Sequence, residues 1–277
     1  MNPALTLPDG RRLSLGATPL LMGVVNVTPD SFSDGGLFAD PGVAIAHGLK
    51  LAQQGADIVD IGGESTRPGH QRLDAATELA RVLPVIAGVA AGSSVPISID
   101  TYKAEVAQAA LKAGAAIVND VWGCQREPAI AAVAARFGAP MVLMHNRDSI
   151  DAGLDILAEV LRFLEKSIAI ATAAGVPLGQ LVVDPGIGFG KSPAQNLALI
   201  EKLDRLPAAL GCPVLLGASR KSTLGLVTGR TVAAERVAAS ISAHLYGVMR
   251  GAAIIRAHDI DEHADALKVW AAIQGTK

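Results

Sequence analysis

Polar side chains that could do chemistry recur in this chain at the ends of short apolar segments. The clearest case is Asp184, which follows two valines and precedes Pro185 and the glycine-rich stretch Gly186–Gly190. Proline cannot donate to a sheet ladder, and glycine adopts backbone conformations that other residues avoid. We therefore expect Asp184 to end a buried strand, with its carboxylate at the start of a loop.

A lysine follows this stretch, so the segment superficially resembles a nucleotide-binding P-loop. A P-loop needs a glycine five positions before the glycine that precedes Lys191, and Pro185 occupies that place. The spacing of a dinucleotide fingerprint is absent as well. We interpret the segment instead as a flexible wall beside Asp184, with Phe189 available for stacking.

Two acids and an amide end three different apolar segments, at Asp100, Asn119 and Asp184. Carboxylates accept the N–H groups of an amino-pyrimidinone edge, and an amide can both donate and accept. Each residue alone could cap a loop or balance a cation. Together they predict a pocket for a flat heterocycle.

A lysine stands in the polar turn Ser219–Ser222. Lys221 could form a Schiff base, but such lysines usually lie desolvated within a strand, whereas this one follows Arg220. A donor to a ligand carbonyl or ring nitrogen is the favoured interpretation. A solvated lysine at a helix start is the alternative.

Basic and hydroxyl groups come from two further loops, at Thr66, Arg67, Arg256 and His258. Such groups at one rim predict an anion site that a diphosphate would fit. His258 could instead cap a helix that starts near Ile260.

Two hard oxygen donors, Asn26 and Asp60, are expected near this rim and could hold Mg²⁺ together with phosphate oxygens and waters. His145 has no serine or cysteine partner with the geometry of a nucleophile, so a hydrolytic triad is not predicted.

The elements that must position these side chains are eight strand–helix units in sequence. The expected strands are Leu20–Val27, Ala56–Ile61, Pro96–Asp100, Ala116–Asn119, Met141–His145, Val182–Asp184, Pro213–Gly217 and Ala252–Arg256. Helices are expected between them, including Pro41–Gln54, Asp74–Ala90, Gly153–Ala174, Pro193–Leu206, Val232–Met249 and Ile260–Ile273.

Eight such units predict an α/β fold, a single (β/α)8 TIM barrel with its active site at the carboxyl ends of the strands. An open doubly wound sheet is the alternative, but no nucleotide fingerprint follows the first strand. Residues 1–19 are expected to form a lead-in with a possible small hairpin near Asp9, and residues 20–277 the barrel.

Composition restricts the class of protein. Of 277 residues, 50% are hydrophobic and 18% charged, with a net charge of −2, so nucleic acid is not an expected partner. The uncharged run Val82–Ile99 contains two prolines and is not expected to span a membrane. Two cysteines without metal-ligand spacing suggest a reducing compartment, so we expect a cytoplasmic protein. The small, apolar helix Val232–Met249 suggests a homo-oligomer.

Four motifs together resemble the dihydropteroate synthase family. They are Asn26–Gly36 (NVTPDSFSDGG), Asp60–Gly69 (DIGGESTRPG), Asp184–Lys191 (DPGIGFGK) and Ser219–Ser222 (SRKS). The resemblance extends in order from about Leu20 to Ile273. The first two motifs are highly specific, and the glycine-rich motif is specific only in their company.

The resemblance implies a reaction in folate biosynthesis. The family condenses 6-hydroxymethyl-7,8-dihydropterin diphosphate with 4-aminobenzoate to 7,8-dihydropteroate and releases diphosphate. It also implies a TIM barrel, Mg²⁺, a homodimer and inhibition by sulfonamides, which mimic 4-aminobenzoate.

The resemblance implies roles for particular residues. Asp100, Lys221 and Arg67 would be catalytic, and Asn26 would bind the metal. The pterin would contact Asp100, Asn119, Val121, Met144, Asp184, Phe189, Gly217 and Lys221. The diphosphate would contact Thr66, Arg67, Arg256 and His258, and 4-aminobenzoate would contact Phe32, Phe189, Lys221 and Ser222.

One segment departs from the family pattern. Asn146 and Arg147 follow His145 where many members have Met and Gln, which affects the expected pterin contacts near the fifth strand. Two other functions remain as alternatives, a corrinoid-dependent methyltransferase barrel and a non-catalytic pterin-binding protein. The loop Thr28–Gly36 argues against the first, and intact Asn26, Lys221 and Arg256 argue against the second.

Overall fold

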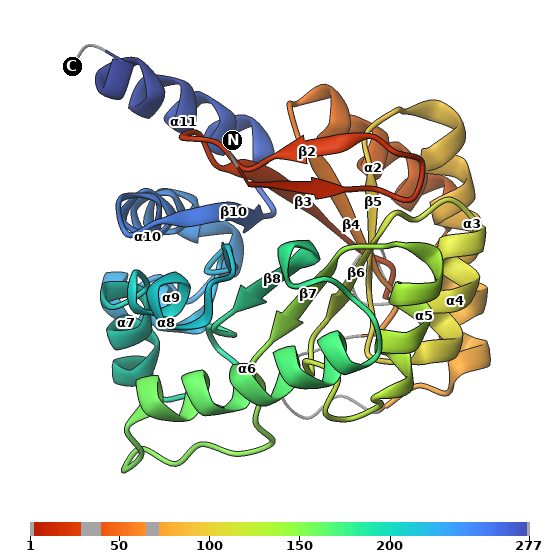
Figure 1. The fold of residues 1–277 in the computed structure, drawn as a ribbon. Helices are drawn as coiled ribbons and strands as arrows, with labels where there is room; N and C mark the ends of the chain where they lie inside the picture. The colour runs from red at the N-terminus through yellow and green to blue at the C-terminus, as the bar shows by residue number, and fades with distance from the viewer. Residues whose placement is uncertain (1–2, 29–39, 65–71, 276–277) are drawn as a thin grey trace.

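A computed structural model describes residues 3–28, 40–64 and 72–275. Its centre is a closed barrel of eight parallel strands in the order β10-β3-β4-β5-β6-β7-β8-β9 (Figure 1). The strands are β3 (Leu20–Asn26), β4 (Ile58–Gly62), β5 (Ile97–Asp100), β6 (Ile117–Asp120), β7 (Met141–Met144), β8 (Leu181–Asp184), β9 (Val214–Leu216) and β10 (Ala252–Ala257). Most of their residues are buried, because helices cover the outside and side chains fill the inside. The predicted TIM barrel is confirmed.

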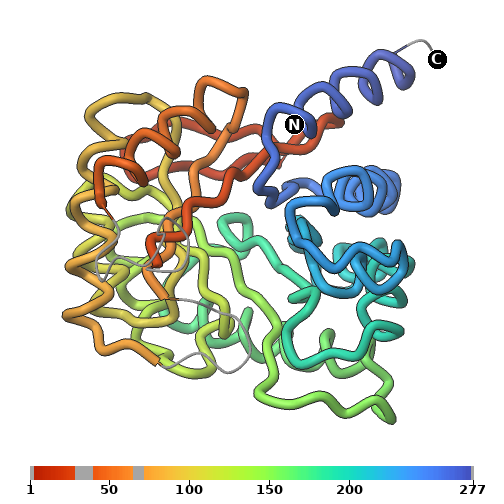
Figure 2. The backbone as a smooth tube through the Cα atoms, turned by 180° about the vertical axis from the view of Figure 1, so that it is seen from behind, coloured from red at the N-terminus to blue at the C-terminus, as the bar shows by residue number. Residues whose placement is uncertain are grey.

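Helices form the outer layer of the barrel, as the tube in Figure 2 shows from behind. They are α2 (Pro41–Gln53), α3 (Ala75–Gly92), α4 (Ala104–Lys112), α5 (Ala129–Phe137), α6 (Ile156–Ala173), α7 (Pro193–Glu201), α8 (Arg205–Leu210), α9 (Ser222–Thr228), α10 (Val237–Met249) and α11 (Ile260–Gly275), with 3-10 turns η1 (Leu178–Gln180) and η2 (Ala233–Arg236). Side chains of Asp40, Asp74, Asp155 and Ser192 cap the starts of α2, α3, α6 and α7 by accepting backbone N–H groups.

Two helix predictions need correction. The expected helix Pro193–Leu206 ends at Glu201, and α8 starts afresh at Arg205. Pro207 explains the break, because its ring excludes a continuous helix through the preceding turn but fits the first turn of a new one. The helix expected from Val232 begins as the 3-10 turn η2 and becomes α-helical at Val237.

A hairpin precedes the barrel and closes its amino-terminal end. Strands β1 (Ala4–Thr6) and β2 (Arg12–Ser14) pair in antiparallel fashion. Leu5, Leu7 and Leu15 pack with side chains from the starts of the barrel strands, among them Met22 and Ile58. Ligands are therefore expected at the opposite end, where the strands end.

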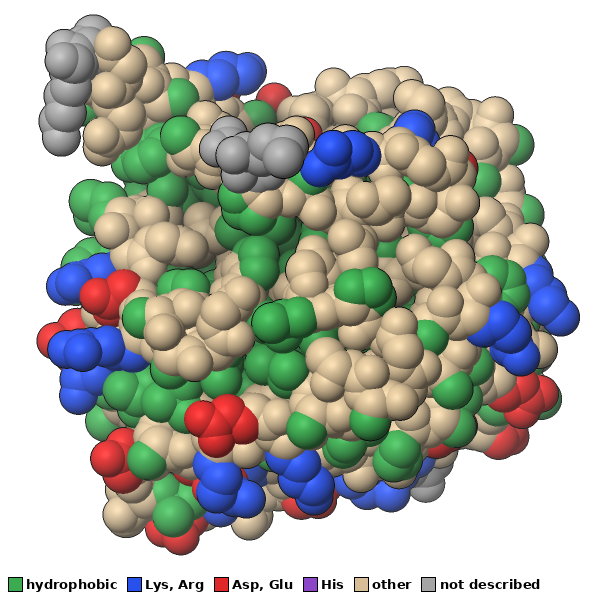
Figure 3. Space-filling view, viewed as in Figure 1, with side chains coloured by type: hydrophobic (Ala, Val, Ile, Leu, Met, Phe, Trp, Pro, Cys, Tyr) green, Lys and Arg blue, Asp and Glu red, His purple; other side chains and the backbone are tan. Residues whose placement is uncertain are grey.

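Helix α3 is, among the described residues, the one long and apolar enough to cross a membrane by length and composition. It packs between α2 and α4 against the barrel, and it carries the buried Glu78, which forms an ion pair with Lys103. Its apolar character is thus explained by its place in the helical layer. On the face shown in Figure 3, acidic and basic side chains are interspersed along the edges.

Candidate active site

The polar strand ends lie at the carboxyl end of the barrel, and a cavity of about 470 Å³ opens there beside Asp100. Its walls come from the loops after β4 to β8 and from the start of α3. The lining residues are Glu64, Arg72, Glu78, Asp100, Thr101, Tyr102, Val121, Trp122, Arg126, Asn146, Arg147, Asp148, Ser149, Ile150, Gly188, Phe189, Gly190 and Lys191.

Arg256 on β10 links two acids at the carboxyl end of the barrel, which we call the mouth. Its Nε donates to Asp60 Oδ2 (2.7 Å), and its Nη2 donates to Asp100 Oδ2 (2.6 Å). Asn119 Nδ2 donates to the same oxygen of Asp60 (3.1 Å). The amide oxygen of Asn119 is therefore the atom of that side chain that could accept a hydrogen bond from a ligand.

Burial controls the charges of this network. Loss of hydration raises the pKa of Asp100 to about 7, although the Arg256 guanidinium opposes the shift. Burial favours a lower pKa for Arg256, but the two acids outweigh it and raise the pKa above its usual value, so the guanidinium stays charged. Asp60 is fully buried, and its Oδ1 has no hydrogen-bond partner among the described residues. The site thus combines one permanent cation with two buried acids.

Asp184 ends β8, as predicted, and its Oδ1 accepts the N–H of Gly186 (2.7 Å). Gly186 has φ +68°, and a Cβ there would lie 1.9 Å from the His145 carbonyl oxygen, so only glycine fits. Burial raises the pKa of Asp184, while the Gly186 N–H and Lys221 oppose that rise.

Lys191 holds the glycine-rich loop together from inside. Its Nζ donates to the carbonyl oxygens of Gly186 (2.8 Å) and Phe189 (3.0 Å). Burial lowers the pKa of Lys191 to about 7, against the attraction of Asp184. The resemblance to a P-loop therefore reflects a lysine that binds its own loop, and the prediction did not include this role.

Lys221 lies over the Phe189 ring, with its Nζ 4.1 Å from the ring centroid. Burial and the nearby Arg256 lower the pKa of Lys221 to about 8. Gly217 keeps space open beside the acid of β8, because a Cβ there would lie 3.8 Å from Asp184 Oδ2. The structure thus brings Asp184, Phe189, Gly217 and Lys221 together, as the sequence predicted.

His258 follows β10 and contacts the loop after β9. Its backbone N–H and its Nδ1 lie 3.2 and 2.9 Å from Ser219 Oγ. Burial and the neighbouring Arg256 lower the pKa of His258 to about 3, so its imidazole is neutral. Ser222, one residue beyond Lys221, is exposed at the first position of α9.

The segment that departs from the family pattern ties two loops together. Asn146 Nδ2 donates to the Val121 carbonyl oxygen (2.9 Å), and Asn146 Oδ1 accepts the N–H of Arg147 (2.8 Å). Val121 and Met144 are buried at the ends of β6 and β7. His145 is fully buried against the edge of Phe163, and burial lowers its pKa to about 2.

Several predicted site residues lie outside the described residues, namely Phe32, Thr66 and Arg67. Asn26 is described and ends β3 opposite Gly62 of β4. Within the described part of the chain, no group of three or more His, Cys, Asp or Glu side chains is arranged to hold a metal ion.

Sequence reasoning missed two features of the cavity wall. Lys103 forms ion pairs with both Glu64 and Glu78, and Arg126 lies 3.6 Å over the Trp122 ring. The ion pair of Glu78 could have been suspected from the sequence. Glu78 lies on the apolar stripe of α3 with Val82, where an unpaired acid would be costly.

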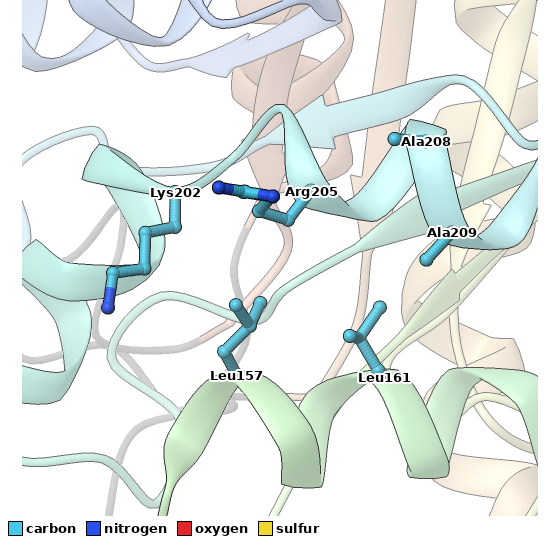
Figure 4. A pocket seen from close by; sticks show the side chains of 6 residues that line it. All are labelled: Leu157, Leu161, Lys202, Arg205, Ala208 and Ala209. Atoms are coloured by element: carbon cyan, nitrogen blue, oxygen red, sulfur yellow. The ribbon is translucent and has the colours of Figure 1, made fainter.

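A second hollow, of about 520 Å³, lies on the outer surface between α6 and α8 (Figure 4). Its lining consists of Leu157, Leu161, Lys202, Arg205, Ala208 and Ala209. It contains no carboxylate and no strand end, so it lacks the groups that the predicted chemistry needs.

Comparisons with known proteins agree on one family. The sequence model of a family described as pterin binding enzyme matches residues 22–258. Dihydropteroate synthase of Clostridium beijerinckii is 42% identical over 94% of this chain and 96% of its own length.

Two solved structures from Xanthomonas albilineans are also similar. The first is dihydropteroate synthase with 4-aminobenzoic acid, with a TM-score of 0.94 and 47% identity over 99% of each chain. The second is dihydropteroate synthase in complex with 7,8-dihydropteroate, with a TM-score of 0.88 and 46% identity over 98% of this chain and 99% of that one.

Proposed function

The chain belongs to the dihydropteroate synthase family and transfers a dihydropterin to 4-aminobenzoate, and we propose how its barrel mouth divides this work. One end of the mouth, around Asp184, holds the pterin. The other end, around Arg256, receives the diphosphate. The observation that carries this proposal is the convergence of Asp100, Asn119 and Asp184 with the cations Lys221 and Arg256.

The pterin end is supported by hydrogen-bonding chemistry. The Asp184 carboxylate accepts from the 2-amino group and ring N–H of the pterin, and Lys221 donates to a ring acceptor. Phe189 provides a ring face, and Val121 and Met144 provide apolar walls. Asp184 is buried and bonded to Gly186, so it is fixed in place before the ligand arrives.

The diphosphate end is supported by the permanent charge of Arg256 and by the neutral imidazole of His258. Thr66 and Arg67, which lie outside the described residues, complete this set in our proposal. A guanidinium suits phosphate oxygens because it presents paired donors in one plane.

The described donors near the end of β3 also fit Mg²⁺. Asn26 offers a single amide oxygen at the end of β3, which suits an ion that keeps waters and takes phosphate oxygens. When bound, Mg²⁺ would neutralise charge on the leaving diphosphate.

The chain's own residues then act mainly by positioning and by charge. Diphosphate departs early, since an electron-rich dihydropterin stabilises the methylene cation that remains. Asp100 and Asp184 oppose that positive charge, and Arg256 and Arg67 take up the charge of the leaving group. Bound substrates that exclude water from the mouth would prevent hydrolysis of the cation.

The second substrate would meet the pterin above Lys221. We place 4-aminobenzoate among Phe32, Phe189, Lys221 and Ser222, where the Lys221 ammonium over the Phe189 ring provides both charge and an aromatic face. Sulfonamides are expected to compete for this place.

The test is release of diphosphate from the dihydropterin diphosphate substrate with Mg²⁺, with and without 4-aminobenzoate. The proposal predicts release that depends on 4-aminobenzoate. Binding of pterin without release would indicate a non-catalytic pterin-binding protein, and methyl transfer to a corrinoid would indicate the other alternative.

We also propose that the enzyme is a cytoplasmic homodimer. Large apolar side chains are exposed at Leu226 (70%), Val227 (64%) and Met249 (63%), on α9 and at the end of α10. Exposed apolar side chains of this kind suit contact with a second copy of the chain. Analytical ultracentrifugation should give twice the mass of the chain, and a Leu226→Glu variant should sediment as a monomer.

A further inference from the structure

Helix α10 fixes the loop that carries Lys221. Two of its side chains, one helical turn apart, accept the N–H groups of two residues of that loop. His244 Nε2 accepts from Ala218 (3.0 Å), and Ser240 Oγ accepts from Arg220 (2.9 Å). Arg236 donates to the Arg220 carbonyl oxygen (2.9 Å). These contacts hold the residue before Lys221 in a left-handed conformation with φ 56°, which is costly for arginine.

The same loop is joined to the segment after β10. His244 Nδ1 lies 2.8 Å from His263 Nε2, and His263 Nδ1 lies 2.6 Å from the Asp259 carbonyl oxygen. Arg220 also donates two hydrogen bonds to the Asp259 carboxylate. Helices α10 and α11, which carry the two histidines, lie side by side (Figure 2).

The donors and acceptors in this chain of bonds match in one arrangement. Ala218 N–H must donate to His244 Nε2, so neutral His244 carries its proton on Nδ1 and donates it to His263 Nε2. His263 then carries its proton on Nδ1 and donates it to the Asp259 carbonyl oxygen. Each N–H meets one acceptor, and an additional proton would place two donors face to face.

We propose that His244 and His263 are positioning residues that set the distance between the β9–α9 loop (residues 217–221) and the β10–α11 loop (residues 258–259). The proposal rests on the proposed function, in which Lys221 belongs to the pterin end and Arg256 and His258 to the diphosphate end. A substrate that joins pterin to diphosphate spans both loops. Its affinity therefore depends on their relative placement, whereas each half alone can settle against its own loop.

The surroundings keep both imidazoles neutral. Burial lowers the pKa of His244 and of His263. His258 and His263 face His244 and add to this effect, while Asp259 and Glu262 partly offset it at His263. The nearby Arg220 cation is already paired with Asp259.

The test compares binding of free dihydropterin and of dihydropterin diphosphate to the full chain by calorimetry. His244→Leu, which removes both ring nitrogens, should weaken the joined substrate by about tenfold to a hundredfold and free pterin by less than about twofold. His244→Gln keeps an acceptor for Ala218 and should restore part of the loss. His263→Asn keeps a donor near Asp259 and gives a second variant if His244→Leu does not fold.

Leu267→Ala is the matched control, because Leu267 is buried one turn beyond His263 on α11. It should lower the melting temperature without a selective loss of the joined substrate. Equal loss of both ligands in the histidine variants, or a selective loss in Leu267→Ala, would overturn the proposal.

Nitrogen NMR of the wild-type chain provides a readout that needs no substrate. Both imidazoles should be neutral, with protons on Nδ1, at pH 6. Protons on Nε2 would contradict the inference. Absence of diphosphate release by the wild-type chain would refute the proposed function, whereas normal release with unaffected variants would refute only the positioning role.

Discussion

Arg256 on β10 donates a 2.6 Å hydrogen bond to Asp100 on β5, although β3 and β4 lie between these strands in the barrel. On the way it also binds Asp60 on β4. One side chain therefore neutralises acids from two other strands and remains at the end where we place the diphosphate. Arg256 therefore contributes both to the stability of the fold and to binding of the charged substrate.

Replacing Arg256 with alanine should lower both the stability of the protein and its affinity for dihydropterin diphosphate. Asp60 and Asp100 would be left buried without their cation, so the free energy of unfolding should fall by about 3–5 kcal/mol. The variant should lose at least about tenfold more affinity for dihydropterin diphosphate than for free pterin. Urea denaturation and calorimetry measure the two effects.

Arg250 offers a control for that variant, because it lies at the end of α10, where its guanidinium contacts the Tyr246 hydroxyl. Arg250→Ala should change stability by less than about 0.5 kcal/mol. If Arg256→Ala weakened both ligands equally, Arg256 would be a structural bridge rather than a diphosphate ligand.

The pH dependence of kcat/KM should be bell-shaped between two groups of the mouth. Asp100 has a pKa raised to about 7, so it loses its negative charge as the pH falls below that value. Lys221 has a pKa lowered to about 8, so it loses its positive charge above that value. Activity should be greatest between them. In Lys221→Arg the fall in kcat/KM at high pH should disappear, because a guanidinium does not titrate in that range. If the fall remained, it would belong to another group.

The glycine-rich loop should depend on Lys191. Lys191→Met removes the donor that serves the carbonyl oxygens of Gly186 and Phe189, so stability should fall by about 1–3 kcal/mol. Hydrogen exchange should become faster in residues 185–191, and pterin should bind more weakly. Lys202→Met, at an exposed lysine after α7, is the control. Unchanged exchange in Lys191→Met would show that the glycines alone define the loop.

Acid should destabilise the fold through its buried histidines. The folded-state pKa values of His145 (about 2) and His258 (about 3) lie below the unfolded value of 6.5, so unfolding takes up protons below that pH. The free energy of unfolding should therefore fall as the pH drops below about 6.5, by up to about 1.4 kcal/mol per pH unit for each of the two histidines. Asp100 contributes in the opposite direction. Between its pKa in the unfolded and in the folded state, its contribution to the free energy of unfolding rises as the pH falls.

The difference between wild type and His145→Leu isolates one of these histidines, because all other groups are shared. Denaturation between pH 7 and pH 5 should show a smaller slope for the variant. Identical slopes would mean that His145 takes up its proton in the folded state.

The sequence predicted the order of the barrel because apolar strands and amphipathic helices alternate without interruption. It also predicted that Asp184 with its neighbour Phe189 and the turn of Lys221 lie close together, because strand ends in a closed parallel barrel share one face, whereas Gly217 was expected there from the resemblance to the family. The inferences from the barrel need only the spacing of apolar residues in each element and the identity of its final residue.

Pairings across the barrel could not be predicted in the same way. The bonds of Arg256 to Asp60 and Asp100 depend on register and on the reach of a side chain across two strands. The contact between His244 and His263 depends on how two outer helices pack. Helix α9 entered only as the alternative in which Lys221 stands at a helix start, because Ser222–Thr228 is short and contains a glycine and β-branched residues, all weak helix formers.

The most direct test of the account is calorimetric titration of Asp184→Asn with free dihydropterin. An asparagine keeps the size of the side chain but replaces one acceptor oxygen with a donor, which opposes the N–H edge of the ligand. We expect affinity to fall by at least about tenfold, with Asp148→Asn, at an exposed acid of the cavity rim, close to wild type. Unchanged pterin affinity in Asp184→Asn would contradict the assignment of this carboxylate as the pterin acceptor.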